Sequence, residues 1–208
     1  MRAAVGPAAE RECLTNLPMW YPLKDFTVQE AKGFLRSDFA RVVKRTKYLY
    51  VERKPKKSIG YGFFEPILLC LCWCDFLGAL YCGDGKSISA GGIGNTKRSK
   101  KFIDEILGAV NSEYKNVSHD LIRVYRHGTV HAFAPTRTFE IRLSDKAHHL
   151  RIENDRVVVS VEQLLDDLLG GTKYFAKRLR HVSTSLMPGT LGAFNKGRRE
   201  LLIRAKNS

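Results

Sequence analysis

Acidic side chains are scarce in this chain, which carries 21 Asp and Glu against 35 Lys and Arg and has a formal net charge of +14 at pH 7. A cationic excess of this size favours a polyanionic partner, because each neutralised phosphate releases counterions, and nucleic acid is the commonest polyanion. Two alternatives are an anionic membrane surface and a surface that charge keeps soluble. The composition therefore predicts a protein that binds nucleic acid.

Long hydrophobic runs are also missing. The most apolar stretch, residues 67–82, is interrupted by Asp75 and is short for a bilayer span, so it predicts a buried core helix. Residues 1–14 lack the sustained apolar region of a secretory signal. Four of the five cysteines lie in the apolar stretch and indicate reduced core thiols: Cys70, Cys72, Cys74 and Cys82. We therefore expect a cytoplasmic protein with no membrane partner.

The glycine-rich segment lacks a nucleotide-binding motif. Residues 83–95 contain five glycines and predict a mobile loop, but they lack the Gly-Lys-Ser/Thr ending of a phosphate-binding P-loop. No internal repeat or clear linker divides the chain, and a hydrophobic content of 44% over 208 residues is ample for one core. We expect a single elaborated domain that holds no cofactor.

Helical signals dominate the pattern of apolar residues. Thr27 and Glu30 have the spacing of a capping box, so a helix should begin near Val28 and run to about Arg45. Residues 47–51 have the composition of a short strand. Further helices are predicted at 65–83, from a Thr96 cap to about 110, at 121–133, and from a Ser160–Gln163 capping box over a last long helix.

The fold class that follows is mainly α, with four to five helices. A small antiparallel β-hairpin or sheet, at about 137–159, is inserted before the last long helix, where apolar and polar residues alternate. We expect a loosely ordered arm over residues 1–20, a helical domain over 21–182 and a basic tail over 183–208. Gly170 and Gly171 predict a kink in the last helix, because glycine is unfavourable there.

One helical segment carries a candidate catalytic motif. Residues 121–133, with the sequence LIRVYRHGTVHAF, place Leu121, Tyr125 and Ala132 on one helical face. The polar side chains lie on the other side: Arg123, Arg126, His127 and His131. At about 100° per residue, Arg126 and His131 are about 140° apart around the axis, so one helix alone does not bring them together. A second copy across a two-fold axis would, because the same patch of both subunits then meets.

The stretch from Tyr125 to His131 resembles the signature of HEPN domains, in which an arginine is followed by four to six residues and then a histidine. The order of elements over about residues 27–182 is also similar, although the short motif alone is residue-specific. HEPN domains are all-α and are often metal-independent ribonucleases of bacterial conflict and phage-defence systems. The resemblance implies a HEPN-like bundle in which Arg126 is the motif arginine, His131 the motif histidine and His127 the polar residue after the arginine.

Metal-independent RNA cleavage needs few groups. The 2′-hydroxyl attacks the adjacent phosphate while a base removes its proton and cations stabilise the phosphorane, which leaves a 2′,3′-cyclic phosphate. Histidine titrates near neutral pH and arginine offers a fork of donors to phosphate, so we assign proton transfer to His131 and the scissile phosphate to Arg126. His127 and Arg123 are supporting groups. Asp75 would orient a motif side chain or pair with another of the many basic residues.

Clusters of basic residues are candidate phosphate contacts. The residues that we expect to bind nucleic acid lie in a loop and in the first turns of the third predicted helix: Arg53, Lys54, Lys56, Lys57, Lys97, Arg98, Lys100 and Lys101. The basic residues of 196–206 extend the same charge toward the C-terminus.

Two other function classes compete with the nuclease. His127 and His131 have the i, i+4 spacing of helical zinc sites, but the segment lacks the glutamate after the first histidine that zinc peptidases use, and no third ligand is evident. A catalytically silent module that binds nucleic acid or a partner protein suits the charge equally well. A defence or toxin setting also implies a cognate antitoxin or a sensor protein as a partner.

The separation of Arg126 and His131 around the helix predicts that the protein is at least a homodimer, with both motif helices lining one cleft. Static light scattering at micromolar concentration should therefore give at least twice the mass of the chain. A monomer under these conditions would contradict the shared site.

Overall fold

The computed structural model describes residues 24–53, 64–123, 139–179 and 186–206. Over these ranges the chain is mainly helical, with six helical segments and one three-stranded sheet. The first segment joins α2 (Val28–Gly33) through π-helical turns at Phe34–Phe39 to α3 (Ala40–Lys47) and further π-helical turns at Tyr48–Glu52. The others are α4 (Phe64–Cys82), α5 (Asn95–Phe102) with π-helical turns at Ile103–Leu107, α6 (Tyr114–Asp120), α8 (Val161–Arg178) and α9 (Leu191–Lys206). Ile88–Ala90 form a 3₁₀ turn.

The first helix begins where the sequence predicts it. The Glu30 amide donates to Thr27 Oγ1 at 3.2 Å and the Thr27 amide donates to Glu30 Oε2 at 2.6 Å, which completes the capping box. The strand expected at 47–51 is wrong, because helical turns continue to Glu52. Val43 is buried and Val51 packs against the same core eight residues later, a spacing that keeps both on one helical face.

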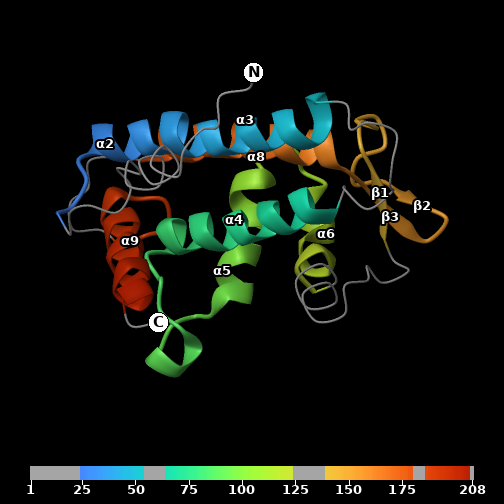
Figure 1. Ribbon diagram of the computed structural model, residues 1–208. Helices are drawn as coiled ribbons and strands as arrows, with labels where there is room; N and C mark the ends of the chain where they lie inside the picture. The colour runs from blue at the N-terminus through green and yellow to red at the C-terminus, as the bar shows by residue number, and fades with distance from the viewer. Residues whose placement is uncertain (1–23, 54–63, 124–138, 180–185, 207–208) are drawn as a thin grey trace, which may run out of the picture.

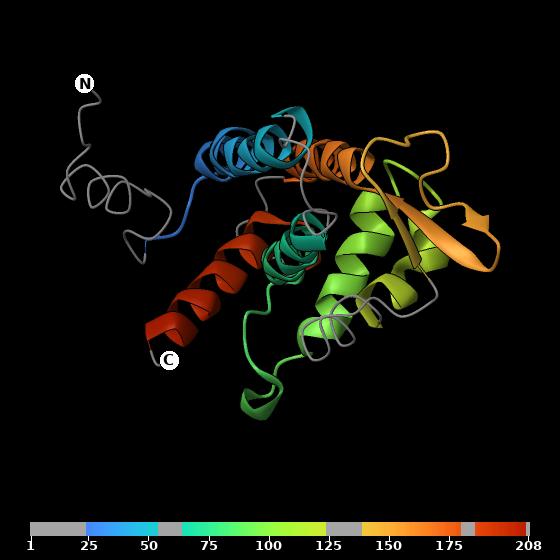
Figure 2. The ribbon, with the colours of Figure 1, turned by 45° about the vertical axis from the view of Figure 1, so that its right-hand side comes forward.

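Helix α4 lies at the centre of the molecule, with α2, α3 and α8 along one side and α5 and α9 packed against it (Figures 1 and 2). Two glycines permit its closest contacts. A Cβ atom at Gly78 of α4 would lie 2.5 Å from the Arg98 carbonyl oxygen of α5, and one at Gly197 of α9 would collide with the Ala79 carbonyl. By length and composition Glu65–Cys82 would suit a membrane span, but α4 is packed as a core helix, as expected.

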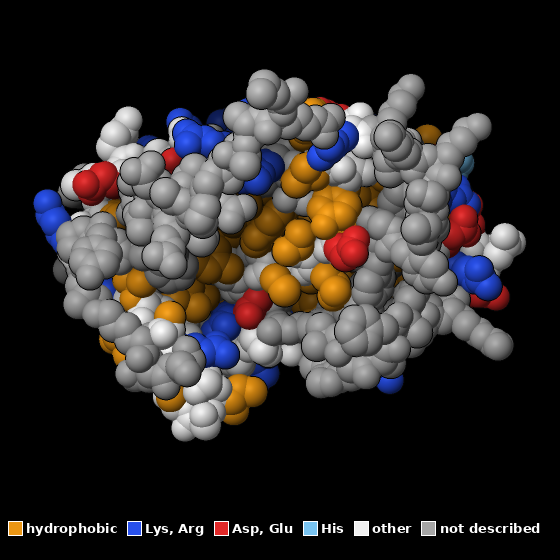
Figure 3. All heavy atoms as spheres, in the orientation of Figure 1, with side chains coloured by type: hydrophobic (Ala, Val, Ile, Leu, Met, Phe, Trp, Pro, Cys, Tyr) orange, Lys and Arg blue, Asp and Glu red, His pale blue; other side chains and the backbone are white. Residues whose placement is uncertain are grey.

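The cysteines of α4 form no disulfides among the described residues, and only part of the expectation for them is confirmed. Cys70 and Cys74 are buried, and burial raises the pKa of both thiols. Cys82 is half-buried, and Cys72 is exposed rather than a core residue because it lies on the side of α4 that faces outward with Leu69. Figure 3, in the orientation of Figure 1, shows hydrophobic side chains gathered at the centre of the molecule, over α4.

The C-terminal segment differs from the expected basic tail. Residues Leu191–Lys206 form α9, whose Phe194 is fully buried. Asn195 fastens this helix to the start of the chain, because its side chain accepts from the Phe26 amide and donates to the Phe26 carbonyl, both at 2.9 Å. The apolar residues of α9 recur at helical spacing among glycines and basic residues, which explains why this segment packs as a helix. With α9 the number of helical segments in the described residues exceeds the predicted four to five.

The sheet has the order β1-β3-β2, formed by Phe139–Arg142, Arg156–Ser160 and Ile152–Glu153 respectively. β2 and β3 pair in the antiparallel sense across a turn in which Asn154 and Asp155 have positive φ, as in a type I′ hairpin. The prediction of a wholly antiparallel sheet is wrong, because β1 runs parallel to β3 with Phe139 opposite Val157. The buried run from Val157 to Val159 is typical of a strand covered on both faces.

Helix α8 follows β3 without a linker. Ser160 ends the strand and caps the helix, since its Oγ accepts from the Gln163 amide at 3.4 Å. The Gln163 side chain instead donates to Asp167, so only half of the expected capping box forms. The predicted apolar face is confirmed as buried: Val161, Leu164, Leu165, Leu168, Phe175 and Leu179. Helix α8 continues through Gly170 and Gly171, and a Cβ at Gly171 would lie 2.8 Å from Leu107 Cδ2, so close packing favours glycine there.

Close packing at α4 predicts opposite effects for alanine at different helical glycines. Gly78→Ala and Gly197→Ala should each lower the free energy of unfolding by about 1–3 kcal/mol, because the added methyl meets backbone atoms of a neighbouring helix. Gly33→Ala is the matched control: Gly33 is helical and has open space at its Cβ position, so the change should stabilise by about 0.5–1 kcal/mol. Urea denaturation of the three variants measures the effects, and equal signs would contradict the packing argument.

Candidate nucleic-acid interface

The structure describes the helix that leads to the predicted motif. Arg126, His127 and His131 lie outside the described residues, as do Lys54, Lys56 and Lys57. Helix α6 begins at Tyr114, earlier than the predicted start at Leu121, and helical turns continue to Arg123. Leu121 and Ile122 are buried while the predicted supporting residue Arg123 is exposed, so the apolar and polar sides of this segment are as expected up to Arg123.

A small pocket joins α5 to the end of α6. Its lining residues are Thr96, Lys100, His119, Ile122 and Arg123, and its volume is about 140 Å³. We call it the α5–α6 pocket. It brings together Lys100 and Arg123, two groups that the sequence assigned separately to phosphate binding and to support of the motif. His119 also lines the pocket, so the three side chains offer several hydrogen-bond donors to a single anionic group such as a phosphate.

The lysines of α5 face outward. Lys97 is exposed, Lys100 Nζ lies 2.5 Å from Asp104 Oδ2, and Lys101 Nζ lies 4.0 Å from Glu105 Oε1. Both ion pairs join residues four apart on the partly exposed side of this helical segment, and pairs of this kind contribute little to stability. Their lysines can therefore turn toward phosphates at small cost. Arg53, at the end of the first helical segment, is also exposed.

Arg98 is the exception in this cluster, and its assignment to nucleic-acid binding is wrong. Its side chain is 1% exposed, and its Nε donates to Asp75 Oδ1 at 2.6 Å. Its Nη1 donates to the carbonyls of Asp84 and Lys86 at 3.3 and 3.1 Å. Asp75 is thus paired with a structural arginine of α5, which was the second of the two roles open to it. The useful signal was the carboxylate within the apolar helix, because such a group requires a partner.

The pairing of Arg98 also fastens the glycine-rich loop, residues 83–94. Within this loop the Asp84 carboxylate accepts from the Lys86 and Ile93 amides at 3.0 and 2.6 Å. The Gly85 amide donates to Glu200 of α9 at 2.8 Å. The segment expected to be a mobile loop is therefore tied to both α5 and α9. Helix α5 begins at Asn95, one residue before Thr96, and Gly94 with φ of 84° occupies the capping position. Thr96 therefore does not cap the helix as predicted, and it lines the α5–α6 pocket.

A buried polar network connects α6, α8 and the segment before β2. Tyr114 Oη donates to Asp167 Oδ2 at 2.9 Å and lies 3.0 Å from His149 Nε2, while His149 Nδ1 accepts from the Ser160 amide at 3.0 Å. Burial and the neighbouring Asp167 raise the pKa of Tyr114 well above its ordinary value. Sequence reasoning placed His149 in the strand region and missed this network. All three side chains are buried, so the network stabilises the fold and does not meet solvent.

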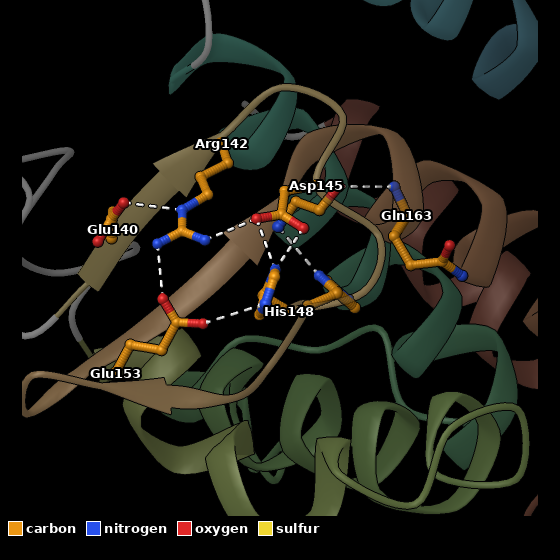
Figure 4. Close-up of polar contacts among 8 residues, drawn as sticks. Glu140, Arg142, Asp145, His148, Glu153 and Gln163 are labelled. Carbon is orange, nitrogen blue, oxygen red and sulfur yellow. Dashed lines mark hydrogen bonds and ion pairs between the residues drawn. The ribbon is translucent and has the colours of Figure 1, made fainter.

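A second polar cluster holds the sheet together at the surface. Arg142 contacts Glu140, Asp145 and Glu153 at 2.6–2.8 Å, and His148 Nδ1 lies 2.7 Å from Asp145 Oδ1 (Figure 4). The hydrogen bond from Arg142, followed by that from His148, lowers the pKa of Asp145 to about 2. Three carboxylates around one arginine make this cluster unsuitable for phosphate. It connects β1 with β2 and with the segment between them.

Comparison with known proteins adds no assignment: no family model, curated protein or solved structure matches the chain. The resemblance to HEPN domains thus depends on the sequence pattern described above. Within the described ranges, no group of three or more His, Cys, Asp or Glu side chains could hold a metal ion. The alternative zinc site at His127 and His131 concerns residues outside those ranges.

Neighbouring cations of α5 should respond differently to loss of charge. Arg98→Met should lower the free energy of unfolding by about 3 kcal/mol or more, because it removes the partner of Asp75 and the donor to two loop carbonyls. Lys97→Met should change it by no more than about 0.5 kcal/mol, because Lys97 is exposed. Chemical denaturation checks both values. Similar stabilities of the two variants would contradict the structural role of Arg98.

Proposed function

We propose that this protein is a metal-independent endoribonuclease of the HEPN type, which acts as a cytoplasmic homodimer in a bacterial defence or toxin–antitoxin setting. The observation that carries the proposal is the spacing of Arg126 and His131 in a chain with a net charge of +14. The α5–α6 pocket supports it, because its exposed Arg123 is three residues before Arg126 in the sequence. Cations at this position suit a negatively charged substrate next to the motif.

The proposed chemistry is transesterification followed by release of the product. A base removes the proton of the ribose 2′-hydroxyl, whose oxygen attacks the adjacent phosphorus, and the 5′-oxygen leaves with a proton from an acid. His131 supplies proton transfer, Arg126 binds the non-bridging phosphate oxygens, and His127 supports them. Arg123 and Lys100 hold a neighbouring phosphate. The products are a 2′,3′-cyclic phosphate and a 5′-hydroxyl.

The second candidate is a catalytically silent module that binds nucleic acid. The specific observation in its favour is that the exposed lysines of α5 and the α5–α6 pocket need no chemistry to bind phosphates. A cognate antitoxin or sensor protein would be a partner under either proposal. Tight RNA binding without cleavage identifies the silent module, and dependence on a divalent metal identifies the zinc alternative.

Substitution of the motif tests the nuclease directly. Purified protein should cut mixed RNA in EDTA and leave 2′,3′-cyclic phosphate ends. His131→Ala and Arg126→Ala should each reduce the rate about a hundredfold or more, because a general acid or base and a transition-state cation each contribute at that level. Product ends are identified by mass spectrometry, and rates are compared per folded molecule.

Leu121→Ala is the control for effects on the fold. Leu121 is 1% exposed, so the change should cost about 2–5 kcal/mol of stability and leave the rate per folded molecule unchanged. Motif variants that cut RNA as fast as the parent would refute the assigned roles. A parent that binds RNA but does not cut it in EDTA would replace the nuclease with the silent module or the metal enzyme.

A further inference from the structure

A second basic hollow lies on the opposite side of the molecule from the α5–α6 pocket. It runs along α3 and the start of the π-helical turns that follow, and we call it the α3 groove. Its volume is about 600 Å³. Its lining residues are Arg41, Lys44, Arg45, Lys47, Tyr48, Glu52, Asp166 and Leu169, the last two from α8. Four cations therefore meet two carboxylates in one open hollow.

The two carboxylates of α8 nearest the groove are already paired with lysines. Lys47 Nζ lies 2.6 Å from Asp166 and 3.5 Å from Glu162, and Lys146 Nζ lies 3.0 and 2.8 Å from the same two side chains. These contacts lower the pKa of both carboxyl groups, so they stay ionised and keep the lysines close. Lys47 consequently acts as a tie between α3 and α8.

The remaining three cations of the groove lie on one face of α3. Arg41, Lys44 and Arg45 are exposed, and among the described residues none of them forms an ion pair. Their spacing, together with Tyr48, is i, i+3, i+4 and i+7, which places all four on one face of the helix. Three guanidinium or ammonium groups thus line one wall of the groove, and none is ion-paired within the part of the chain that the structure describes.

The groove also offers an aromatic surface. Tyr48 is 54% exposed at the start of π-helical turns that contain no buried residue, and Leu169 provides an apolar patch on the α8 wall. An exposed aromatic ring beside a row of cations is the combination by which proteins bind single-stranded nucleic acid, with bases on the ring and phosphates on the cations. A duplex would not expose base faces to Tyr48.

The position of the groove separates it from the α5–α6 pocket. Figures 1 and 2 both show α2 and α3 along one side of α4, and the N-terminal end of α5 on the other side. Figure 3 shows Lys and Arg side chains along the upper edge of the molecule, where α2 and α3 run in Figure 1. A ligand of the α3 groove is therefore bound apart from the α5–α6 pocket.

We propose that the α3 groove is a second binding surface for single-stranded RNA, in which Arg41, Lys44 and Arg45 contact successive phosphates and Tyr48 stacks on a base. This inference takes RNA as the ligand from the proposed function but requires no cleavage. A concave wall of cations follows a linear polyanion, whereas cations that hold a protein on a flat lipid surface lie in one plane. The groove increases the affinity for RNA and the number of nucleotides in contact with the protein, and it leaves the bond-breaking step unchanged.

Salt dependence of binding provides the sharpest test. The probe is a fluorescein-labelled single-stranded RNA of about 20 nucleotides, titrated with full-length protein between about 50 and 200 mM KCl. The triple variant Arg41→Gln, Lys44→Gln, Arg45→Gln should weaken binding about tenfold or more and reduce the slope of log K against log salt by about 2, since each single-strand phosphate contact contributes about 0.7. Tyr48→Leu should weaken binding about fivefold or more with no change of slope, because it removes stacking alone.

The matched control replaces three exposed cations elsewhere, as Lys24→Gln, Arg151→Gln and Arg156→Gln. It removes the same charge but should leave both affinity and slope within about twofold of the parent. Circular dichroism melting of each variant excludes unfolding as the cause. Equal losses in the control and in the groove variant would overturn the proposal, because the effect would then reflect net charge.

Two further results separate this proposal from its alternatives. Unchanged RNA binding by the triple variant, with loss of binding to phosphatidylserine vesicles that the parent binds, would overturn it in favour of a membrane surface. Single-turnover cleavage at saturating RNA should stay at the parent's rate in the triple variant, in contrast to His131→Ala. If the parent cuts no RNA yet the groove variant loses affinity, the nuclease fails and the groove stands.

Discussion

The contact between Asp75 and Arg98 determines how the helices around α4 are arranged. A carboxylate within an apolar helix must have a partner before the helix can be buried, and Arg98 reaches it from α5 at 2.6 Å. The same guanidinium holds the loop carbonyls of Asp84 and Lys86, so one side chain joins α4, α5 and the loop that separates them. The absence of a Cβ at Gly78 permits this close approach. With Arg98 facing inward, Lys97 is directed outward, so the internal contact is what exposes the basic side of α5.

The distribution of carboxylates decides where the cationic excess reaches the surface. Arg142 gathers three carboxylates at the sheet, and Asp166 with Glu162 is paired to Lys47 and Lys146 beside α8. Five carboxylates are thereby paired at two structural junctions. The α3 groove and the α5–α6 pocket keep cations that no such junction neutralises. The excess of 35 Lys and Arg over 21 Asp and Glu therefore reaches the surface in part at these two basic regions, where the electrostatic potential favours an anion.

Sequence patterns predicted the parts of this fold that depend on neighbours along the chain. The Thr27 capping box and the buried face of α8 follow from spacing within one or two turns, and both are confirmed. Patterns failed where distant contacts decide. The composition of residues 47–51 suits a strand, but in the fold Val51 packs against the helical core; the direction of β1 depends on the path of residues 143–151. Of the candidate site, Arg98 could not be distinguished from Lys97 by composition, because only the location of Asp75 separates a buried cation from an exposed one.

The bond between the Ser160 amide and His149 Nδ1 fixes the tautomer of a buried ring. Because Nδ1 accepts, the neutral imidazole carries its hydrogen on Nε2, which faces Tyr114 Oη and Asp167 Oδ2. The Tyr114 hydroxyl in turn donates to Asp167, so the hydrogen bonds that link Ser160, His149, Tyr114 and Asp167 all run in the same donor-to-acceptor direction. A proton added at His149 Nδ1 would occupy the lone pair that now accepts the Ser160 amide hydrogen, and this hydrogen bond would be lost. The junction at which β3 becomes α8 therefore depends on one nitrogen lone pair remaining free of a proton.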